Sequence, residues 1–230
     1  MSVISDNLND IREKIKIAAQ KSNRKEEDIT LIAVTKTYSP EVINEAIDCG
    51  VTDIGENKVQ EIVEKYDKVK KVRWHLIGHL QTNKVKYIID KVYMIHSVDS
   101  TRLMDEIERQ AKKHNVKMKI LIQVNISGEE SKFGIKPEEI DEMLLHAGTL
   151  NNVEVCGLMT ILPKVDNCVS LRLQFVNIKR IYIDISQKKY NNISMQYLSM
   201  GMSGDFELAV EEGSNMVRIG RAIFGERNYG

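Results

Sequence analysis

Eight short apolar runs recur along the chain, and their spacing constrains the fold more than any other feature of the sequence. Several are apolar at consecutive positions, as in parallel strands covered by helices, whereas half-exposed antiparallel strands would alternate apolar and polar residues. We therefore expect buried parallel strands at residues 30–36, 51–55, 73–78, 92–98, 119–125, 153–160, 194–200 and 215–220.

Helical patterns fill the segments between these runs. Ser39 and Pro40 fit the N-cap and first position of a helix, and the apolar residues after them repeat at helical spacing. Similar apolar faces follow Asp99 and Pro137. The segment 171–189 alternates like a strand over IYIDI, but helical spacing accounts for more of its apolar residues, and we interpret it as a helix.

Strand and helix alternate eight times within 230 residues, a length suited to one large domain. This pattern predicts an α/β protein, a (β/α)8 TIM barrel with an extra N-terminal helix, in which residues 1–230 form a single domain. The alternative is an open doubly wound sheet, which typically carries a G-x-G-x-x-G turn after an early strand. Here the first such turn reads TKTYSP, so the barrel is favoured.

Charge and cysteine content argue against several classes of protein. Thirty-three Lys and Arg residues balance thirty-three Asp and Glu residues without long single-sign blocks, unlike a nucleic-acid-binding protein. Three cysteines with no C-x-x-C pair argue against a disulfide framework or a thiolate zinc site and predict a reducing cytoplasm. Since no run resembles a membrane span or a signal core, we expect a soluble, unprocessed protein without membrane association.

In a barrel of this kind, catalytic and binding residues lie at the carboxyl ends of the strands. Lys36 ends the first predicted strand, Asn57 follows the second, and His75 lies within the third. Asn125 ends the fifth and leads into a polar, glycine-containing loop over residues 125–134, a candidate lid. LSMGMSGD and RIGRAIFG follow as the ends of the seventh and eighth strands, so polar and glycine-rich residues collect at one end of the barrel.

Most of these residues also have a purely structural interpretation. His75 and His79 are four apart but straddle a glycine at a strand end, and without an obvious third ligand we do not expect a metal site. Asn57 fits a helix cap equally well, and the glycines of GMSGD fit a turn. Arg218 is different, because a guanidinium within an apolar strand needs an acceptor, which a ligand could supply.

The glycines indicate the kind of ligand. Gly220 opens the short segment RAIFG, where backbone N–H groups can bind an anion, and Ser203 with Gly204 offers a second such helix start. The loops after strands seven and eight are the usual phosphate site of a barrel. Across the mouth, a desolvated Lys36 is suited to form a Schiff base with a carbonyl carbon. A small aromatic molecule with an aldehyde and a phosphate is pyridoxal 5'-phosphate (PLP).

An ordered series of motifs makes the chain resemble the YggS/PROSC family of PLP homeostasis proteins, which are similar to the N-terminal barrel of alanine racemase. The resemblance runs from about residue 6 to residue 227, with a looser match over residues 162–194. It implies a PLP fold type III barrel without the C-terminal β-domain of alanine racemase. The motifs that carry it are AVTKTYS, IGENKVQE, WHLIGHLQTNK, HSVDS, VNISGEESKFGI, GLMTI, LSMGMSGD and VRIGRAIFG.

The resemblance also implies roles for individual residues. Lys36 would carry the Schiff base, Arg218 would face the pyridine nitrogen, and Ser203 with the backbone of Gly220 and Arg221 would hold the phosphate. Arg221 stands where the family commonly has a small hydroxyl residue, so only its backbone is assigned to the phosphate. The full set of expected PLP contacts is Lys36, Asn57, His75, Ser199, Ser203, Arg218, Gly220 and Arg221.

Two functions are compatible with this resemblance. A racemase needs a second acid/base group opposite the lysine, which alanine racemases supply from a C-terminal β-domain, whereas only ten residues follow Gly220 here. An arginine at the ring nitrogen also weakens the ring as an electron sink. We therefore expect a cytoplasmic, monomeric PLP-binding protein of vitamin B6 homeostasis that affects amino-acid metabolism and supplies apo PLP-dependent enzymes. The alternative is a racemase-like enzyme.

Overall fold

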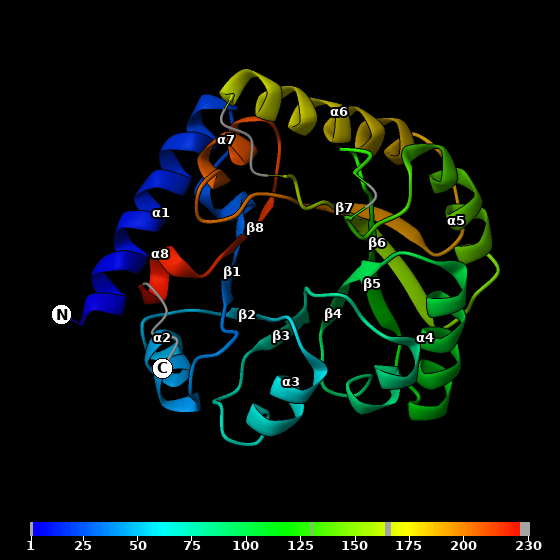
Figure 1. The fold of residues 1–230 in the computed structure, drawn as a ribbon, viewed down its shortest axis with the longest axis horizontal. Coiled ribbons are helices and arrows are strands. Elements are labelled where there is room, and N and C mark those ends of the chain that lie inside the picture. Colours follow the sequence, from blue (N-terminus) through cyan, green and yellow to red (C-terminus); the bar gives the residue numbers. More distant parts are fainter. Residues whose placement is uncertain (1, 130, 164–166, 226–230) are drawn as a thin grey trace.

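A closed barrel of eight parallel strands forms the centre of the molecule, with helices around its outside (Figure 1). The computed structural model describes residues 2–129, 131–163 and 167–225. The strands follow one another around the barrel in chain order, and β8 closes it by pairing with β1, from Thr30 with Met216 to Ala33 with Ile219. This closure confirms the (β/α)8 barrel and excludes the open doubly wound sheet.

Every apolar run of the sequence contains or overlaps one strand, and each strand has four to seven residues. The strands are β1 (Thr30–Val34), β2 (Asp53–Glu56), β3 (Arg73–Leu76), β4 (Met94–Val98), β5 (Met118–Gln123), β6 (Val153–Met159), β7 (Ile193–Ser199) and β8 (Met216–Ile219).

The helices agree with the predicted segments, with one difference after β3, where the chain forms a six-residue 3-10 helix in place of an α-helix. The segment that we interpreted as helical despite its alternation lies within or next to α6. The α-helices are α1 (Val3–Lys21), α2 (Pro40–Asp48), α3 (Val59–Lys65), α4 (Thr101–His114), α5 (Ile140–Ala147), α6 (Cys168–Ser186), α7 (Phe206–Glu211) and α8 (Arg221–Phe224). The 3-10 helices are η1 (Glu26–Asp28), η2 (Thr82–Tyr87) and η3 (Pro137–Glu139).

The extra N-terminal helix, α1, lies alongside α7 and α8, so segments from the two ends of the chain are neighbours (Figure 1). Its buried residues Ile4, Leu8, Ile11 and Ile15 repeat every three or four positions and form one apolar face. Burial of that face stabilises the helix and covers α7 and α8, which follow the two strands expected to carry the phosphate site.

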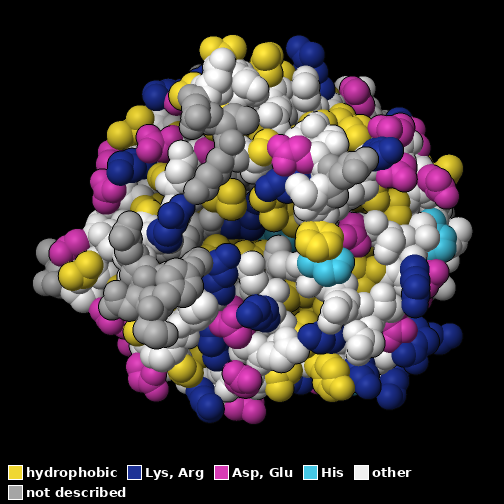
Figure 2. Space-filling view, in the orientation of Figure 1, with side chains coloured by type: hydrophobic (Ala, Val, Ile, Leu, Met, Phe, Trp, Pro, Cys, Tyr) yellow, Lys and Arg dark blue, Asp and Glu magenta, His cyan; other side chains and the backbone are white. Residues whose placement is uncertain are grey.

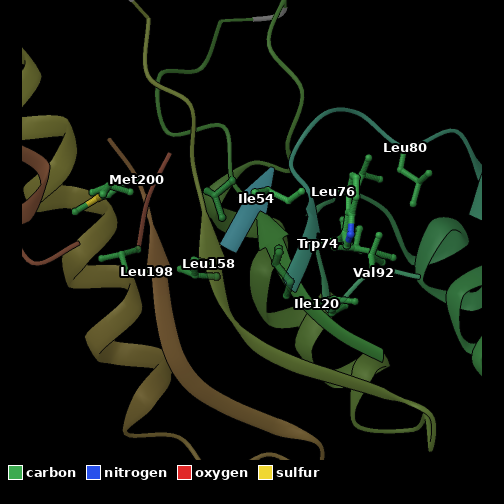
Figure 3. Packing of buried hydrophobic residues seen from close by; sticks show 14 of the residues in the cluster. Ile54, Trp74, Leu76, Leu80, Val92, Ile120, Leu158, Leu198 and Met200 are labelled. Atoms are coloured by element: carbon green, nitrogen blue, oxygen red, sulfur yellow. The ribbon is translucent and has the colours of Figure 1, made fainter. Parts of the chain in front are cut away.

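Alternation along the strands divides the buried side chains into two groups. One group points outward and packs against the helices, as Trp74 and Leu76 of β3 do, and Figure 3 shows part of this layer. The second group is a smaller cluster inside the barrel, formed by Ile32, Met94, Leu121, Cys156, Met159 and Met216. Other inward positions carry polar side chains, and several of these form the site described below.

Among the helices of the described residues, none combines the length and apolar character needed to cross a membrane.

Candidate functional site

Lys36 lies in a tight turn just beyond the carboxyl end of β1. The strand ends at Val34, two residues earlier than the apolar run predicted, and the N–H of Tyr38 donates to the carbonyl oxygen of Thr35 at 3.1 Å to close the turn. Thr37 has a φ of 71°, a left-handed conformation that β-branched residues rarely adopt. Lys36 is half-buried in this turn, so a ligand and solvent can both reach it.

The loops after β7 and β8 place a serine beside a glycine N–H. Ser203 Oγ accepts a hydrogen bond from the N–H of Gly220 at 3.3 Å, and α8 begins at the next residue, Arg221. A Cβ on Gly220 would lie 3.2 Å from the carbonyl oxygen of Val34, on the neighbouring strand β1. A Cβ on Gly204 would meet no described atom within 4 Å. Ser203 and Gly204 therefore border open space, and Gly220 packs against β1, the strand that leads to the lysine turn.

Arg218 points into the barrel from β8 and is only 4% exposed. Its Nη1 donates to Ser199 Oγ at 2.6 Å, and its Nη2 donates to the carbonyl oxygen of Thr160 at 2.8 Å. Burial lowers the pKa of Arg218 to about 10, although the nearby Asp205 carboxyl opposes the shift. The guanidinium is therefore charged at neutral pH, and the protein itself supplies two of the acceptors that its burial demands.

A chain of hydrogen bonds continues from Ser199 across the barrel interior. Ser199 Oγ lies 3.3 Å from His96 Nδ1, and His96 Nε2 lies 2.9 Å from His75 Nδ1. His75 Nε2 lies 2.9 Å from Asp53 Oδ1 at the start of β2. Five strands each contribute one side chain to this hydrogen-bonded series. We call the series the interior chain, and its members are Asp53, His75, His96, Ser199 and Arg218.

The direction of each hydrogen bond in the interior chain follows from the charges at its ends. Burial opposes ionisation of Asp53, but hydrogen bonds from His75 and Arg73 outweigh it and lower its pKa, so the carboxylate accepts and His75 donates. Burial lowers the pKa of His75, and it lowers that of His96 further, so both rings are neutral. His96 therefore donates to His75 and accepts from the hydroxyl of Ser199. Every donor in the interior chain points toward Asp53.

The positions of His75 and Asn57 refine the sequence interpretation. His75 is fully buried within β3, where it contacts Asp53 and His96 rather than the open end of the strand. Asn57 directly follows β2, and the residue at the N-cap of α3 is Lys58, so Asn57 is not the helix cap.

Side-chain contacts hold both halves of the loop after β5, our candidate lid, one within the loop and one to a residue outside it. Asn125 Nδ2 donates to the carbonyl oxygen of Glu129 at 2.8 Å, and near its other end the ring of Phe133 stacks on His79 with centroids 4.1 Å apart. His79 Nδ1 in turn lies 3.5 Å from Asp99 Oδ2. Figure 2 shows a hollow near the centre of this view with Lys or Arg side chains in and around it, and a His beside a hydrophobic side chain at its rim.

Asp53 and His96 are functional candidates that the sequence interpretation missed. The signal that singled out Arg218, a charged residue within an apolar run, was also present for Asp53. His96 lies within HSVDS, but nothing in that motif indicates that its ring meets His75. Within the part of the chain that the structure describes, no group of three or more His, Cys, Asp or Glu side chains is arranged to hold a metal ion.

Comparison with known proteins gives full-length matches. Residues 7–228 match the family model of the alanine racemase N-terminal domain. The pyridoxal phosphate homeostasis protein of Aquifex aeolicus is 44% identical, with 97% of this chain and 98% of the relative covered. The protein of the same name from Escherichia coli K12 is 38% identical, with 100% and 99% covered.

Solved structures of similar proteins also match along nearly the whole chain. PipY of Synechococcus elongatus, with PLP bound, has a TM-score of 0.84 and 30% identity and covers 96% of this chain and 100% of its own. An alanine racemase from Clostridium difficile has a TM-score of 0.74 at 19% identity, with 96% of this chain but 56% of the racemase covered, and it shares the fold.

Proposed function

Because the chain belongs to the family of pyridoxal phosphate homeostasis proteins, we propose that it binds PLP as a Schiff base on Lys36 and takes part in intracellular PLP, or vitamin B6, homeostasis. When bound, PLP supplies an aldehyde that condenses with a lysine amine, releasing water as the C=N bond forms. The single observation that carries the proposal is the position of three groups suited to this cofactor. The Ser203 hydroxyl, the Gly220 N–H and the Lys36 amine follow the ends of the adjacent strands β7, β8 and β1.

The donor set at this site fits the cofactor. Lys36 supplies an amine, and the Ser203 hydroxyl, which accepts from the N–H of Gly220, lies next to Gly204, which faces open space where a phosphate can be bound. Arg218 supplies a fixed, charged donor for an aromatic ring nitrogen, since Ser199 and the backbone hold its guanidinium. We assign Arg221 only through its backbone, because its side chain is exposed at the start of α8.

Asn57 and His75 have different roles in this proposal. Asn57 directly follows β2, next to the end of β1, and we propose that it lies near the ring. His75 is fully buried and holds the interior chain together, so we propose that it acts on the cofactor through Ser199 and Arg218.

We further propose that the protein gives up its PLP to apo PLP-dependent enzymes and acts as a monomer in the cytoplasm. The half-buried position of Lys36 supports release, because an incoming amine needs access to the linkage. An arginine retains its proton even with a pKa of about 10, so it does not protonate the ring nitrogen, which favours storage of the cofactor over strong electron withdrawal.

Borohydride reduction of the PLP-loaded protein tests the assignment. We expect a visible absorption band that disappears on reduction and a phosphopyridoxyl group on Lys36 in the mass map. Lys36→Ala should lose both, while Lys58→Ala, an exposed lysine at the start of α3, should keep them. A label on another lysine, with the band intact in Lys36→Ala, would refute the assignment.

A further inference from the structure

We propose that the ion pair between Lys65 and Glu61 of α3 is the device that positions Lys36, because it holds the peptide groups on both sides of that lysine. The inference rests on the proposed function of Lys36. It concerns two residues outside the cofactor contacts discussed above, and it assigns them a role in how well PLP forms its bond to the protein.

The two ends of one ion pair bracket the lysine. Lys65 Nζ lies 2.7 Å from Glu61 Oε2, one helical turn away on α3. Lys65 Nζ also donates to the carbonyl oxygen of Thr35 at 3.1 Å, and Glu61 Oε2 accepts from the N–H of Thr37 at 2.7 Å. The residues before and after Lys36 are therefore fixed to the same two side chains.

The turn needs such a support, because its conformation is unfavourable for its sequence. Thr37 occupies the left-handed region with a φ of 71°, and it follows Lys36 in a turn that usually carries glycine at this position. Thr37 is exposed, so packing does not hold it there. Its hydrogen bond to Glu61 favours a conformation that a β-branched residue would otherwise leave. A change in the backbone conformation of Thr37 would point the side chain of Lys36 in a different direction.

Burial makes the ion pair a precise support rather than a surface contact. Lys65 is 8% exposed, and its ammonium also pairs with the fully buried Glu56 at 2.8 Å. Burial raises the pKa of Glu56, whereas Glu61, despite some burial, has its pKa lowered by the hydrogen bonds from Lys65 and the Thr37 N–H. Glu61 is therefore ionised at neutral pH, and its charge strengthens the hydrogen bond to the Thr37 N–H.

Pyridoxine 5'-phosphate provides the discriminating ligand, because it has the ring and phosphate of PLP but an alcohol in place of the aldehyde. It can use the phosphate site and Arg218 but cannot bond to Lys36. A residue that acts through Lys36 should change the affinity for PLP and leave that for pyridoxine 5'-phosphate unchanged, whereas general damage to the barrel should weaken both.

Glu61→Ala is the first variant. We expect about a tenfold loss of PLP affinity, because the free-energy cost of the left-handed conformation for a non-glycine residue corresponds to a factor of that size. The affinity for pyridoxine 5'-phosphate should change less than about twofold. Glu64→Ala removes the same charge from an exposed position of the same helix and should bind both ligands like the wild type. In the apoprotein, the Thr37 amide should exchange with solvent faster in Glu61→Ala than in Glu64→Ala.

Rescue by glycine separates positioning from a structural role. Glycine adopts the left-handed region without strain, so Thr37→Gly should recover most of the PLP affinity that Glu61→Ala loses. Should Glu61→Ala fold poorly, Glu61→Gln keeps an acceptor for the Thr37 N–H, removes the ion pair and should give a smaller loss.

Equal losses for both ligands, no loss for either, or no rescue by Thr37→Gly would overturn the inference. Failure of the proposed function would look different, because the wild type itself would then show no borohydride label on Lys36.

Discussion

At the scale of single residues, Arg218 shows how the site combines a permanent charge with near-complete burial. The cost of burying an unpaired guanidinium is offset because Ser199 and the Thr160 carbonyl accept two of its hydrogen bonds. Ser199 ends β7 and Thr160 directly follows β6, so the barrel itself fixes the charge before any ligand arrives. This preorganisation means that PLP binding does not have to position the arginine.

Gly220 is the residue at which phosphate recognition can be tested. Gly220→Asp should weaken binding of PLP at least about tenfold more than binding of unphosphorylated pyridoxal, because a carboxylate would repel the phosphate by about 1.4 kcal/mol or more. Gly220→Asn has nearly the same bulk without the charge, and it controls for the close approach of a Cβ to Val34. Titrations of the wild type and both variants with each ligand measure these losses, and equal losses for PLP and pyridoxal in the aspartate variant would place the phosphate elsewhere.

At the scale of secondary-structure elements, the interior chain shows what alternation along the strands produces. On β3, Trp74 and Leu76 pack against the helices, while His75, between them, points inward to meet His96 of β4. The polar interior thus depends on the same two-residue period that builds the apolar layer outside. A ladder of donors ends on Asp53, and its uniform direction strengthens each bond in turn.

The interior chain should make stability depend on pH. Burial lowers the pKa values of His75 and His96 below the ordinary histidine value of about 6.5, so the folded protein disfavours protons that the unfolded chain takes up. The stability from these neutral rings is complete above pH 6.5 and is lost as pH falls toward their folded pKa values.

His96→Gln tests this pH dependence. We measure the free energy of unfolding in urea at several pH values between 7 and 5. Its slope against pH should be shallower for His96→Gln than for the wild type, by up to about 1.4 kcal/mol per pH unit. His114→Gln, at the exposed end of α4, is the matched control. An unchanged slope in His96→Gln would show that the ring does not resist protonation in the folded state.

At the scale of the whole molecule, closure of the barrel brings together residues that are far apart in the chain. Lys36 and Gly220 are separated by most of the sequence, yet β1 and β8 pair directly and place them at one mouth. The pairing of β1 with β2 likewise lets α3, which follows β2, reach the lysine turn with Lys65. The binding site and its support are therefore properties of the assembled barrel.

The carrier and racemase interpretations can be separated on one preparation of the PLP-loaded protein. We expect it to restore activity to an apo PLP-dependent enzyme, and we expect no sustained racemisation of alanine in a chiral assay. The Lys36→Ala variant, treated with PLP in the same way, is the control, since without the lysine amine it should neither retain PLP nor transfer it. Sustained racemisation that disappears in Lys36→Ala would support the enzyme and would require an acid opposite the lysine.

The local pattern of the sequence determined the elements of this protein and the chemistry available at its mouth. Apolar runs of strand length, helical spacing between them and an N-terminal amphipathic helix are properties of neighbouring residues, and the structure confirms the resulting barrel. Lys36, Arg218 and Gly220 could be selected because each interrupts or ends such a run, and the ion pair of Glu61 with Lys65 fits the four-residue spacing of a helix.

Only the tertiary structure decided which of these residues meet. The interior chain joins five strands, and its contacts depend on strand register and on the closure of the barrel, which no local period encodes. The family resemblance placed His75 among the expected PLP contacts, but only the structure shows that its ring meets His96 and Asp53 inside the barrel. The Lys65–Glu61 pair acquires its place beside the lysine turn only when α3 docks against β1 and β2. Contacts between distant segments follow from packing of the whole chain, and that is why the sequence alone could name the reactive lysine but not its support.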